Sequence, residues 1–468
     1  MRITCLAWLV CLVLVSSCSG SDAGGNSDVT SPIAAGSGAT SSGGAGAGGA
    51  TTAGATTAGA GAGASGNAGA PSTGEAGSDG GSSGNGASGE GAAGAAPDGG
   101  SGSSGDAGSA PPPEVAGCDD ARLLEPPEDP AARGPWPVGV RTVRVGNLDV
   151  EVWYPAQLGS ESGTNQVTYD IRVWLPENER AKISDAESPL QICDCSRDLP
   201  LDAERGPYPG VIYIHGTAAF RSASLAQMTH WASRGFVVAA TDHHGLYLGD
   251  SLAGFSFGAC AGSGIAQNLN GNVDSMIAAL TMASGELAFL SGKLDMTRIA
   301  IAGHSAGASA ASAMSDKPGV RLLMPLAGGG PVTASSTLQS VLFLGGMSDA
   351  VVSYDGVRNG YDGSVSPKRI VGIANAGHLV MTELCDLKNR DGESILTIAQ
   401  ASGICSADLA GFLFDCQPSY VEEAKGTAIV NYATTAALEE TLHCADRSSQ
   451  FAQLQSRLPD VGEFLEAL

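Results

Sequence analysis

The chain contains few aromatic and basic side chains, and they are distributed unevenly along the sequence. Its 468 residues include only 10 Phe, 9 Tyr and 5 Trp, and 24 Lys and Arg stand against 48 Asp and Glu. Residues 19–116 contain no aromatic residue, no cysteine and no basic residue, and are mostly Gly, Ala, Ser and Thr. Such a segment cannot bury enough apolar surface to offset the entropy lost on ordering it. We therefore expect residues 18–116 to form a disordered tether and residues 117–468 to form the folded domain.

The low number of basic residues, the lack of long apolar runs and the lack of CxxC pairs each argue against a class of function. The net charge of −24 argues against nucleic acid as a partner, because phosphate binding needs a surface of Lys and Arg. No apolar run reaches the roughly 18–20 residues of a membrane-spanning helix. The chain has no CxxC pair, and Cys193-Asp194-Cys195 is too tight for the usual spacing of zinc ligands. We predict no metal site and no cofactor.

The N-terminus has the pattern of an export signal. Arg2 precedes an apolar run over residues 5–15, and small residues follow it, so residues 1–17 are predicted to be a signal peptide. The order Val15-Ser16-Ser17-Cys18 resembles the lipobox of bacterial lipoproteins, which implies that Cys18 carries the lipid, and Ser19 resembles lipoproteins sorted to the outer membrane. An ordinary cleaved signal with an incidental cysteine is the alternative. We expect an exported protein that is anchored to the cell envelope, at the outer membrane or cell surface, through this lipid alone.

Eight cysteines lie in the predicted domain, and an even number in an exported chain predicts up to four disulfides. The sequence leaves their pairing open. Four of the eight follow His378, so residues 385–468 are expected to form a disulfide-stapled, helical extension. The eight are Cys118, Cys193, Cys195, Cys260, Cys385, Cys405, Cys416 and Cys444.

The predicted domain alternates short apolar runs with helical patterns. A hairpin opens it, and the later runs are separated by patterns at residues 224–233, 273–283 and 306–314. This alternation predicts an α/β fold with a mostly parallel central sheet and helices on both faces. Ligands then bind beyond the carboxyl ends of the strands. The runs are residues 140–145, 148–154, 211–214, 236–240, 298–302, 322–326, 341–344 and 369–373.

Gly303-His304-Ser305-Ala306-Gly307 fits the G-x-S-x-G pattern of a nucleophile elbow. The pattern is weak in a chain this rich in Gly and Ser, and residues 80–84 and 254–258 also match it. Only Ser305 follows a predicted buried strand and opens a predicted helix. Ser305 is therefore the predicted nucleophile.

A serine nucleophile needs a base, since its free hydroxyl is protonated at neutral pH. In the chain order of the α/β-hydrolase triad, the histidine follows the serine and the acid. Only His378 and His443 follow Ser305, so these two are the candidates for the base. His443 lies beside Cys444 in a late helical stretch and is expected to be structural. His378 follows the strand that ends near Ile373, at the correct end of the sheet, and is the predicted base.

The acid should lie between the nucleophile and the base. Asp349 comes five residues after the predicted strand at 341–344, also at a carboxyl end, and is the predicted acid. Two backbone N–H groups should complete the site by stabilising the oxyanion. We predict those of Ala306, directly after the nucleophile, and of Thr217, after the run at 211–214. The other acid candidates are Asp316, Asp355 and Asp362.

Together these motifs resemble bacterial α/β-hydrolases of the dienelactone-hydrolase-like and platelet-activating-factor-acetylhydrolase-like group, with cutinases and polyester hydrolases as relatives. The resemblance spans about residues 135 to 385. It implies the α/β-hydrolase fold and a serine carboxylester hydrolase whose catalytic residues fall on Ser305, Asp349 and His378, with a lipid or small acyl ester as substrate. Besides the three triad motifs, it is carried by residues 139–143, 150–155, 209–216, 234–238 and 242–245.

The chain departs from this group in several places. Dienelactone hydrolases use a cysteine nucleophile, and polyester hydrolases usually carry aromatic residues where this chain has Thr217 and Ala327-Gly328-Gly329-Gly330. An insertion at 157–205 and the extension at 385–468 are additions to the minimal fold. They form either a lid or a wall of the acyl pocket, or they are disulfide-linked surface additions with no part in the site. An acyltransferase with the same triad, a polyester or cutin hydrolase and a non-catalytic surface-binding module remain alternatives.

Overall fold

The computed structural model describes residues 113–256 and 260–468. The predicted signal peptide, Cys18 and the tether up to residue 112 lie outside these residues. So do the G-x-S-x-G match at 80–84 and part of the one at 254–258. Within the described ranges, no helix has both the length and the apolar character that crossing a membrane requires.

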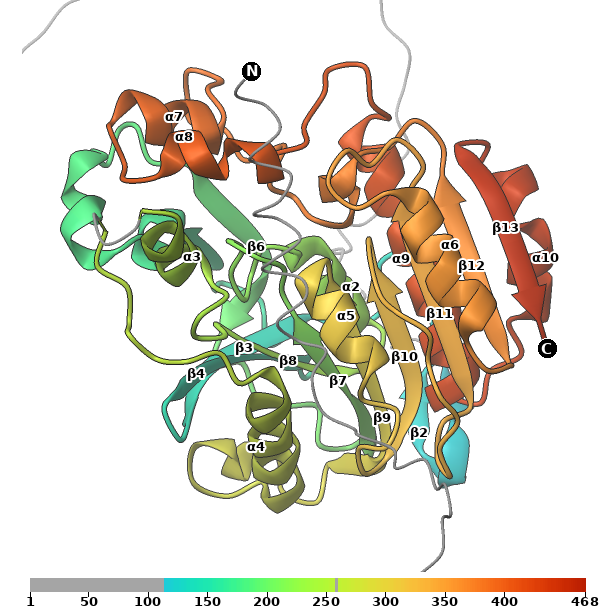
Figure 1. Ribbon diagram of the computed structural model, residues 1–468. Helices are drawn as coiled ribbons and strands as arrows, with labels where there is room; N and C mark the ends of the chain where they lie inside the picture. The colour runs from blue at the N-terminus through green and yellow to red at the C-terminus, as the bar shows by residue number, and fades with distance from the viewer. Residues whose placement is uncertain (1–112, 257–259) are drawn as a thin grey trace, which may run out of the picture. The chain divides into compact units, whose positions relative to one another are not determined.

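One eleven-stranded sheet forms the centre of the domain, in the order β13-β12-β11-β10-β9-β7-β8-β4-β3-β6-β5 (Figure 1). The run from β12 to β8 is parallel throughout, and antiparallel strands flank it on both sides. The strands of this sheet are β3 (Val138–Val145), β4 (Leu148–Pro155), β5 (Gln166–Asp170), β6 (Leu190–Arg197), β7 (Tyr208–Ile214), β8 (Val237–Thr241), β9 (Leu294–His304), β10 (Val320–Leu326), β11 (Ser340–Gly346), β12 (Lys368–Ile373) and β13 (Val461–Ala467).

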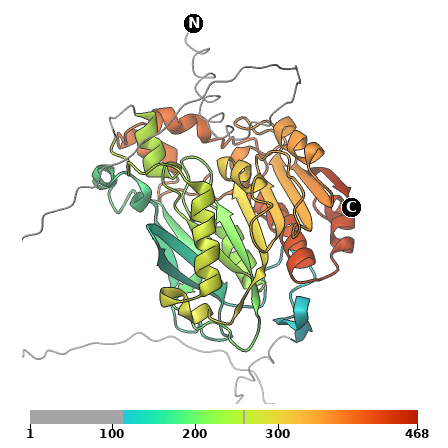
Figure 2. The same ribbon diagram turned by 60° about the horizontal axis from the view of Figure 1, so that its bottom comes forward.

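Helices cover both faces of the sheet, as its fully buried central strands β7, β8 and β11 require. Alternate side chains of β7 illustrate this, since Tyr213 belongs to an apolar cluster with residues of α2, α9 and α10, whereas Ile212 belongs to a second cluster with residues of α4, α5 and α6. The two layers can be followed in Figure 2. The helices are α2 (Leu225–Ser233), α3 (Leu248–Phe255), α4 (Leu269–Met282), α5 (Ala306–Ser312), α6 (Tyr354–Gly363), α7 (Ile395–Ala401), α8 (Ala407–Ala410), α9 (Glu423–Leu442) and α10 (Ser448–Arg457).

This architecture confirms the predicted α/β-hydrolase fold class. Every predicted apolar run coincides with a strand to within one residue, and β3 and β4 form the predicted hairpin. The extension at 385–468 is less uniformly helical than expected, because β13 pairs antiparallel with β12 at the edge of the sheet. The insertion at 157–205 likewise adds β5 and β6 to the opposite edge.

The three residues before the predicted boundary at residue 117 form a strand. Strand β1 (Glu114–Ala116) pairs antiparallel with β2 (Arg122–Leu124). The Glu114 carboxylate forms ion pairs with Arg122 and Arg205, and composition alone gave no sign of them. Residues 114–116 therefore pack with the folded domain, although the sequence assigned them to the tether.

The eight cysteines of the domain form four disulfides: Cys118–Cys444, Cys193–Cys195, Cys260–Cys405 and Cys385–Cys416. Three of them involve the C-terminal extension, which is therefore stapled as predicted. The pairing of neighbours Cys193 and Cys195 leaves neither thiol for a metal. The longest loop, of 326 residues, is closed by Cys118–Cys444.

Removing the long-range disulfide should destabilise the oxidised protein far more than removing the short one. The double variant Cys118→Ala/Cys444→Ala should lose about 3 to 5 kcal/mol of unfolding free energy, because the closed loop restricts the unfolded chain. Its matched control is Cys193→Ala/Cys195→Ala, whose sequence separation of 2 restricts the unfolded chain far less. Chemical denaturation of both variants measures the difference, and equal losses would contradict this account.

Candidate active site

Ser305 stands on a sharp turn between β9 and α5. Its backbone has φ 57° and ψ −115°, a conformation that non-glycine residues rarely adopt. Close packing maintains this turn, because a Cβ at Gly303 would lie 2.2 Å from the Gly307 carbonyl oxygen, and one at Gly307 would lie 2.1 Å from that of Ile214. The G-x-S-x-G spacing at 303–307 is thus a packing requirement, and it holds the serine at the carboxyl end of β9.

His378 and Asp349 meet at the same edge of the sheet. Asp349 follows β11 and His378 follows the neighbouring β12. The His378 Nδ1 atom lies 2.7 Å from Asp349 Oδ2, and both side chains are almost fully buried. The sequence predicts only that each residue lies at the carboxyl end of a strand. The structure makes those two strands neighbours and places the two side chains in hydrogen-bond contact.

The Asp349 carboxylate is fixed on its other side by the backbone. Its Oδ1 atom accepts hydrogen bonds from the N–H groups of Val351, at 2.8 Å, and Val352, at 2.7 Å. One oxygen is therefore committed to the loop, and the other faces the imidazole. The arrangement favours the tautomer in which His378 carries its proton on Nδ1 and presents a free Nε2 lone pair.

Two other buried histidines, His304 and His215, lie near the nucleophile and are held neutral. Burial lowers the pKa of His304 to about 3, and its ring centroid lies 4.8 Å from that of His378. Burial also lowers the pKa of His215, whose Nδ1 lies 2.8 Å from the Gly216 carbonyl oxygen and whose Nε2 accepts from the N–H of His243. His215 thus braces the loop after β7. Neither neighbour adds positive charge next to His378.

The loop after β7 packs directly on the nucleophile. A Cβ at Gly216 would lie 3.1 Å from the Ser305 Cβ, so Thr217 is held close to the serine. In residues 113–256 and 260–468, no protein group accepts a hydrogen bond from the backbone N–H of Thr217 or of Ala306. These are the two amides predicted for the oxyanion, and both remain available to a ligand.

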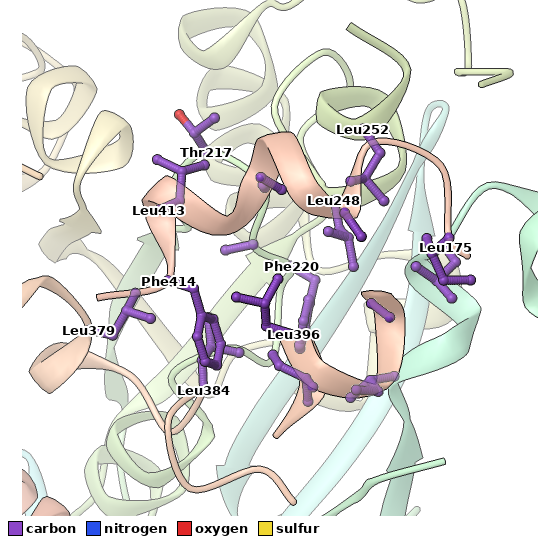
Figure 3. A pocket seen from close by; sticks show the side chains of 18 of the residues that line it. Leu175, Thr217, Phe220, Leu248, Leu252, Leu379, Leu384, Leu396, Leu413 and Phe414 are labelled. Carbon is purple, nitrogen blue, oxygen red and sulfur yellow. The ribbon is translucent and has the colours of Figure 1, made fainter. Parts of the chain in front are cut away.

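Ser305, His304 and His378 line one cavity of about 120 Å³. Its walls are almost entirely apolar, and Figure 3 shows Phe220, Leu248 and Phe414 among the side chains that surround it. The charged Arg172 also lines it, but its guanidinium pairs with Asp170 and Asp185. An apolar cavity beside a buried imidazole suits an apolar substrate group.

Three segments that are far apart in sequence roof this cavity, and we call them the cap: residues 171–183 of the insertion, helix α3, and residues 395–413 of the extension. They share a small apolar cluster that includes Leu175, Leu252 and Ile398. Helices α3, α7 and α8 lie together in Figure 1. The insertion and the extension therefore both form pocket wall, which was one of the alternatives left open.

The cap is also fastened chemically. Cys260–Cys405 joins the loop after α3 to the extension. The buried Glu179 carboxylate accepts from Lys182 at 2.7 Å and from the backbone N–H of Cys405 at 2.8 Å. Lys182 donates in addition to the Gly403 carbonyl oxygen. Insertion and extension thus form one connected roof.

Sequence reasoning missed several features of the site. The cap residues gave no signal, because their apolar positions are common to any packed domain. Asp415 and Tyr420, which contact the loops of Asp349 and His378, carry no motif. Among the described residues, no group of three or more His, Cys, Asp and Glu side chains could hold a metal ion.

Comparison with known proteins adds one relationship. A search of curated proteins found no match for this chain. The match to a family model covers β3 to the loop after β8, including Thr217, and ends before Ser305. Residues 128–246 match the model of the family described as platelet-activating factor acetylhydrolase, isoform II.

Proposed function

We propose that the protein is a serine carboxylester hydrolase that works through an acyl-enzyme. The observation that carries the proposal is the 2.7 Å contact between His378 and Asp349 at the cavity where Ser305 stands on its strained turn. The family model matched by residues 128–246 is named for an acetylhydrolase, which agrees with ester chemistry.

The reaction follows from the position of each group. Ser305 Oγ attacks the ester carbonyl while His378 Nε2 accepts its proton, and Asp349 stabilises the imidazolium through Nδ1. The N–H groups of Ala306 and Thr217 stabilise the negative oxygen of the tetrahedral intermediate. His378 then protonates the departing alcohol. Water activated by the same imidazole releases the acyl group and restores Ser305.

The substrate class follows from the walls of the cavity. Leu252, Leu384 and Phe414 offer no hydrogen bonds, so they favour an apolar acyl or alcohol group over a sugar or a charged headgroup. We infer an ester with an apolar chain as substrate. An aryl polyester is less favoured, because Thr217 stands where an aromatic clamp would be needed.

Fluorophosphonate labelling of the purified protein tests the activated serine. Labelling at Ser305, with loss of ester hydrolysis, is expected, and absence of labelling would favour a non-catalytic binding module. Product analysis with alcohol acceptors present tests the last step. Free acid as the main product supports a hydrolase, whereas a new ester as the main product would make the protein an acyltransferase.

Filling the cavity should change the preference for acyl length. The substitution Ala399→Phe places a ring in the cavity wall of α7. It should lower kcat/KM for p-nitrophenyl octanoate about tenfold or more, and change the value for p-nitrophenyl acetate little. Ala401→Phe, on an exposed position of the same helix, is the matched control. Equal effects of Ala399→Phe on both esters would argue that the chain binds elsewhere.

A further inference from the structure

Asp415 lies beneath the loops that carry the proposed acid and base. One of its carboxylate oxygens, Oδ2, accepts hydrogen bonds from two backbone N–H groups, those of Ala350 and of His378, each at 3.0 Å. The first of these amides is next to Asp349, and the second belongs to the base itself. A single oxygen atom therefore connects the two loops directly behind the 2.7 Å contact between His378 and Asp349.

Tyr420 extends this connection. Its hydroxyl lies 3.0 Å from Asp415 Oδ1 and 3.1 Å from the Ser348 carbonyl oxygen, so it contacts both the carboxylate and the loop of the acid. Its ring packs on the loop of the base, because a Cβ at Gly377 would lie 2.2 Å from Tyr420 Cε2. Asp415 and Tyr420 thus each contact both the loop of Asp349 and the loop of His378.

The position of Asp415 is unusual for a purely structural residue. The side chain is buried, and among the described residues no Lys, Arg or His forms an ion pair with it. A buried carboxylate is costly unless it is hydrogen-bonded. Its donors are two amides of the site loops and the Tyr420 hydroxyl. The carboxylate is therefore satisfied only while the two loops keep their present spacing.

We propose that Asp415 is a positioning residue that fixes His378 relative to Asp349. The proposal rests on the proposed ester hydrolase function. Asp415 belongs to the extension beyond the minimal fold, and the adjacent Cys416 is joined to Cys385, seven residues after the base. The preceding Leu413 and Phe414 line the cavity, but Asp415 does not. The extension thus serves the base as well as the substrate pocket.

The experiment compares Asp415→Ala with Asp415→Asn. Alanine leaves both amides without an acceptor, so kcat for p-nitrophenyl butyrate should fall about 10- to 100-fold through misplacement of the base. KM should stay unchanged, because Asp415 does not line the cavity. Asparagine keeps an oxygen for both amides, and its NH₂ group can donate to the Tyr420 hydroxyl, so kcat should stay near that of the wild type. All rates are normalised to folded protein by circular dichroism.

Hydrogen exchange adds a readout that does not depend on activity. The amides of Ala350 and His378 should exchange faster in Asp415→Ala than in the wild type or Asp415→Asn. If the alanine variant does not fold, Asp415→Ser replaces it, since its shorter side chain cannot span both amides. A wild-type kcat in Asp415→Ala, an equal loss in Asp415→Asn, or an effect on KM alone would overturn the proposal. A wild-type protein that is not labelled by fluorophosphonate would instead overturn the hydrolase function, and hydrogen exchange would still decide the positioning role.

Discussion

Replacing Ser305 with alanine should abolish hydrolysis of short activated esters, with kcat lower by on the order of 10⁵- to 10⁶-fold. The expected loss is large because the proposed acyl-enzyme needs the Ser305 hydroxyl, whereas the proposed oxyanion donors, the amides of Thr217 and Ala306, stay in place. Substrate binding should be unaffected, since the cavity walls are unchanged. Steady-state kinetics with p-nitrophenyl butyrate measures the effect, and intact-protein mass spectrometry with a fluorophosphonate should show no adduct.

The control for this variant is Ser256→Ala, which tests the second G-x-S-x-G match. Ser256 ends helix α3, and its hydroxyl accepts a hydrogen bond from the backbone N–H of Cys260. It follows no strand and does not line the cavity. Its replacement should leave kcat close to that of the wild type. Hydrolysis that survives in Ser305→Ala and disappears in Ser256→Ala would move the nucleophile to the other motif.

The central part of the fold and site could be predicted because the relevant signals are local. A buried strand that ends in the sequence Gly303-His304-Ser305-Ala306-Gly307 specifies the turn. Each of the two glycines is needed because a Cβ at its position would clash with a backbone carbonyl oxygen. Asp349 and His378 each follow an apolar strand by a few residues, and parallel strands end at one edge of a sheet. The position of each residue just after a strand therefore predicted that Asp349 and His378 lie at the same edge of the sheet as Ser305, without any knowledge of side-chain contacts.

The rest of the site could not be predicted because it depends on contacts across long stretches of sequence. Asp415 belongs to no recognisable sequence motif. Only the structure shows that its Oδ2 atom accepts hydrogen bonds from the backbone N–H groups of both Ala350 and His378. The cap joins Glu179 to Cys405 through a hydrogen bond between segments more than two hundred positions apart. The edge strand β13 was missed for a related reason. Its strand structure depends on its antiparallel pairing with β12, and the order of apolar and polar residues within β13 does not reveal that pairing.

Replacing Asp349 with asparagine should lower kcat about 10⁴-fold at neutral pH, with little change in KM. The structure gives the physical reason. The backbone N–H groups of Val351 and Val352 both donate to Asp349 Oδ1, so the amide oxygen of asparagine should take that position. Its NH₂ group then faces His378 Nδ1. A donor at this position makes Nδ1 the acceptor and leaves the proton on Nε2, where the imidazole can no longer accept the proton of Ser305.

Asp355→Asn is the matched control, because Asp355 was an alternative acid and lies exposed in the first turn of α6. It should keep the wild-type rate. The tautomer can be measured separately from activity, since ¹⁵N chemical shifts of the His378 ring distinguish a proton on Nδ1 from one on Nε2. The wild type should carry it on Nδ1 and Asp349→Asn on Nε2. Loss of activity without this change of tautomer would mean that Asp349 acts only by holding the loop, and retained activity would assign the acid to another carboxylate.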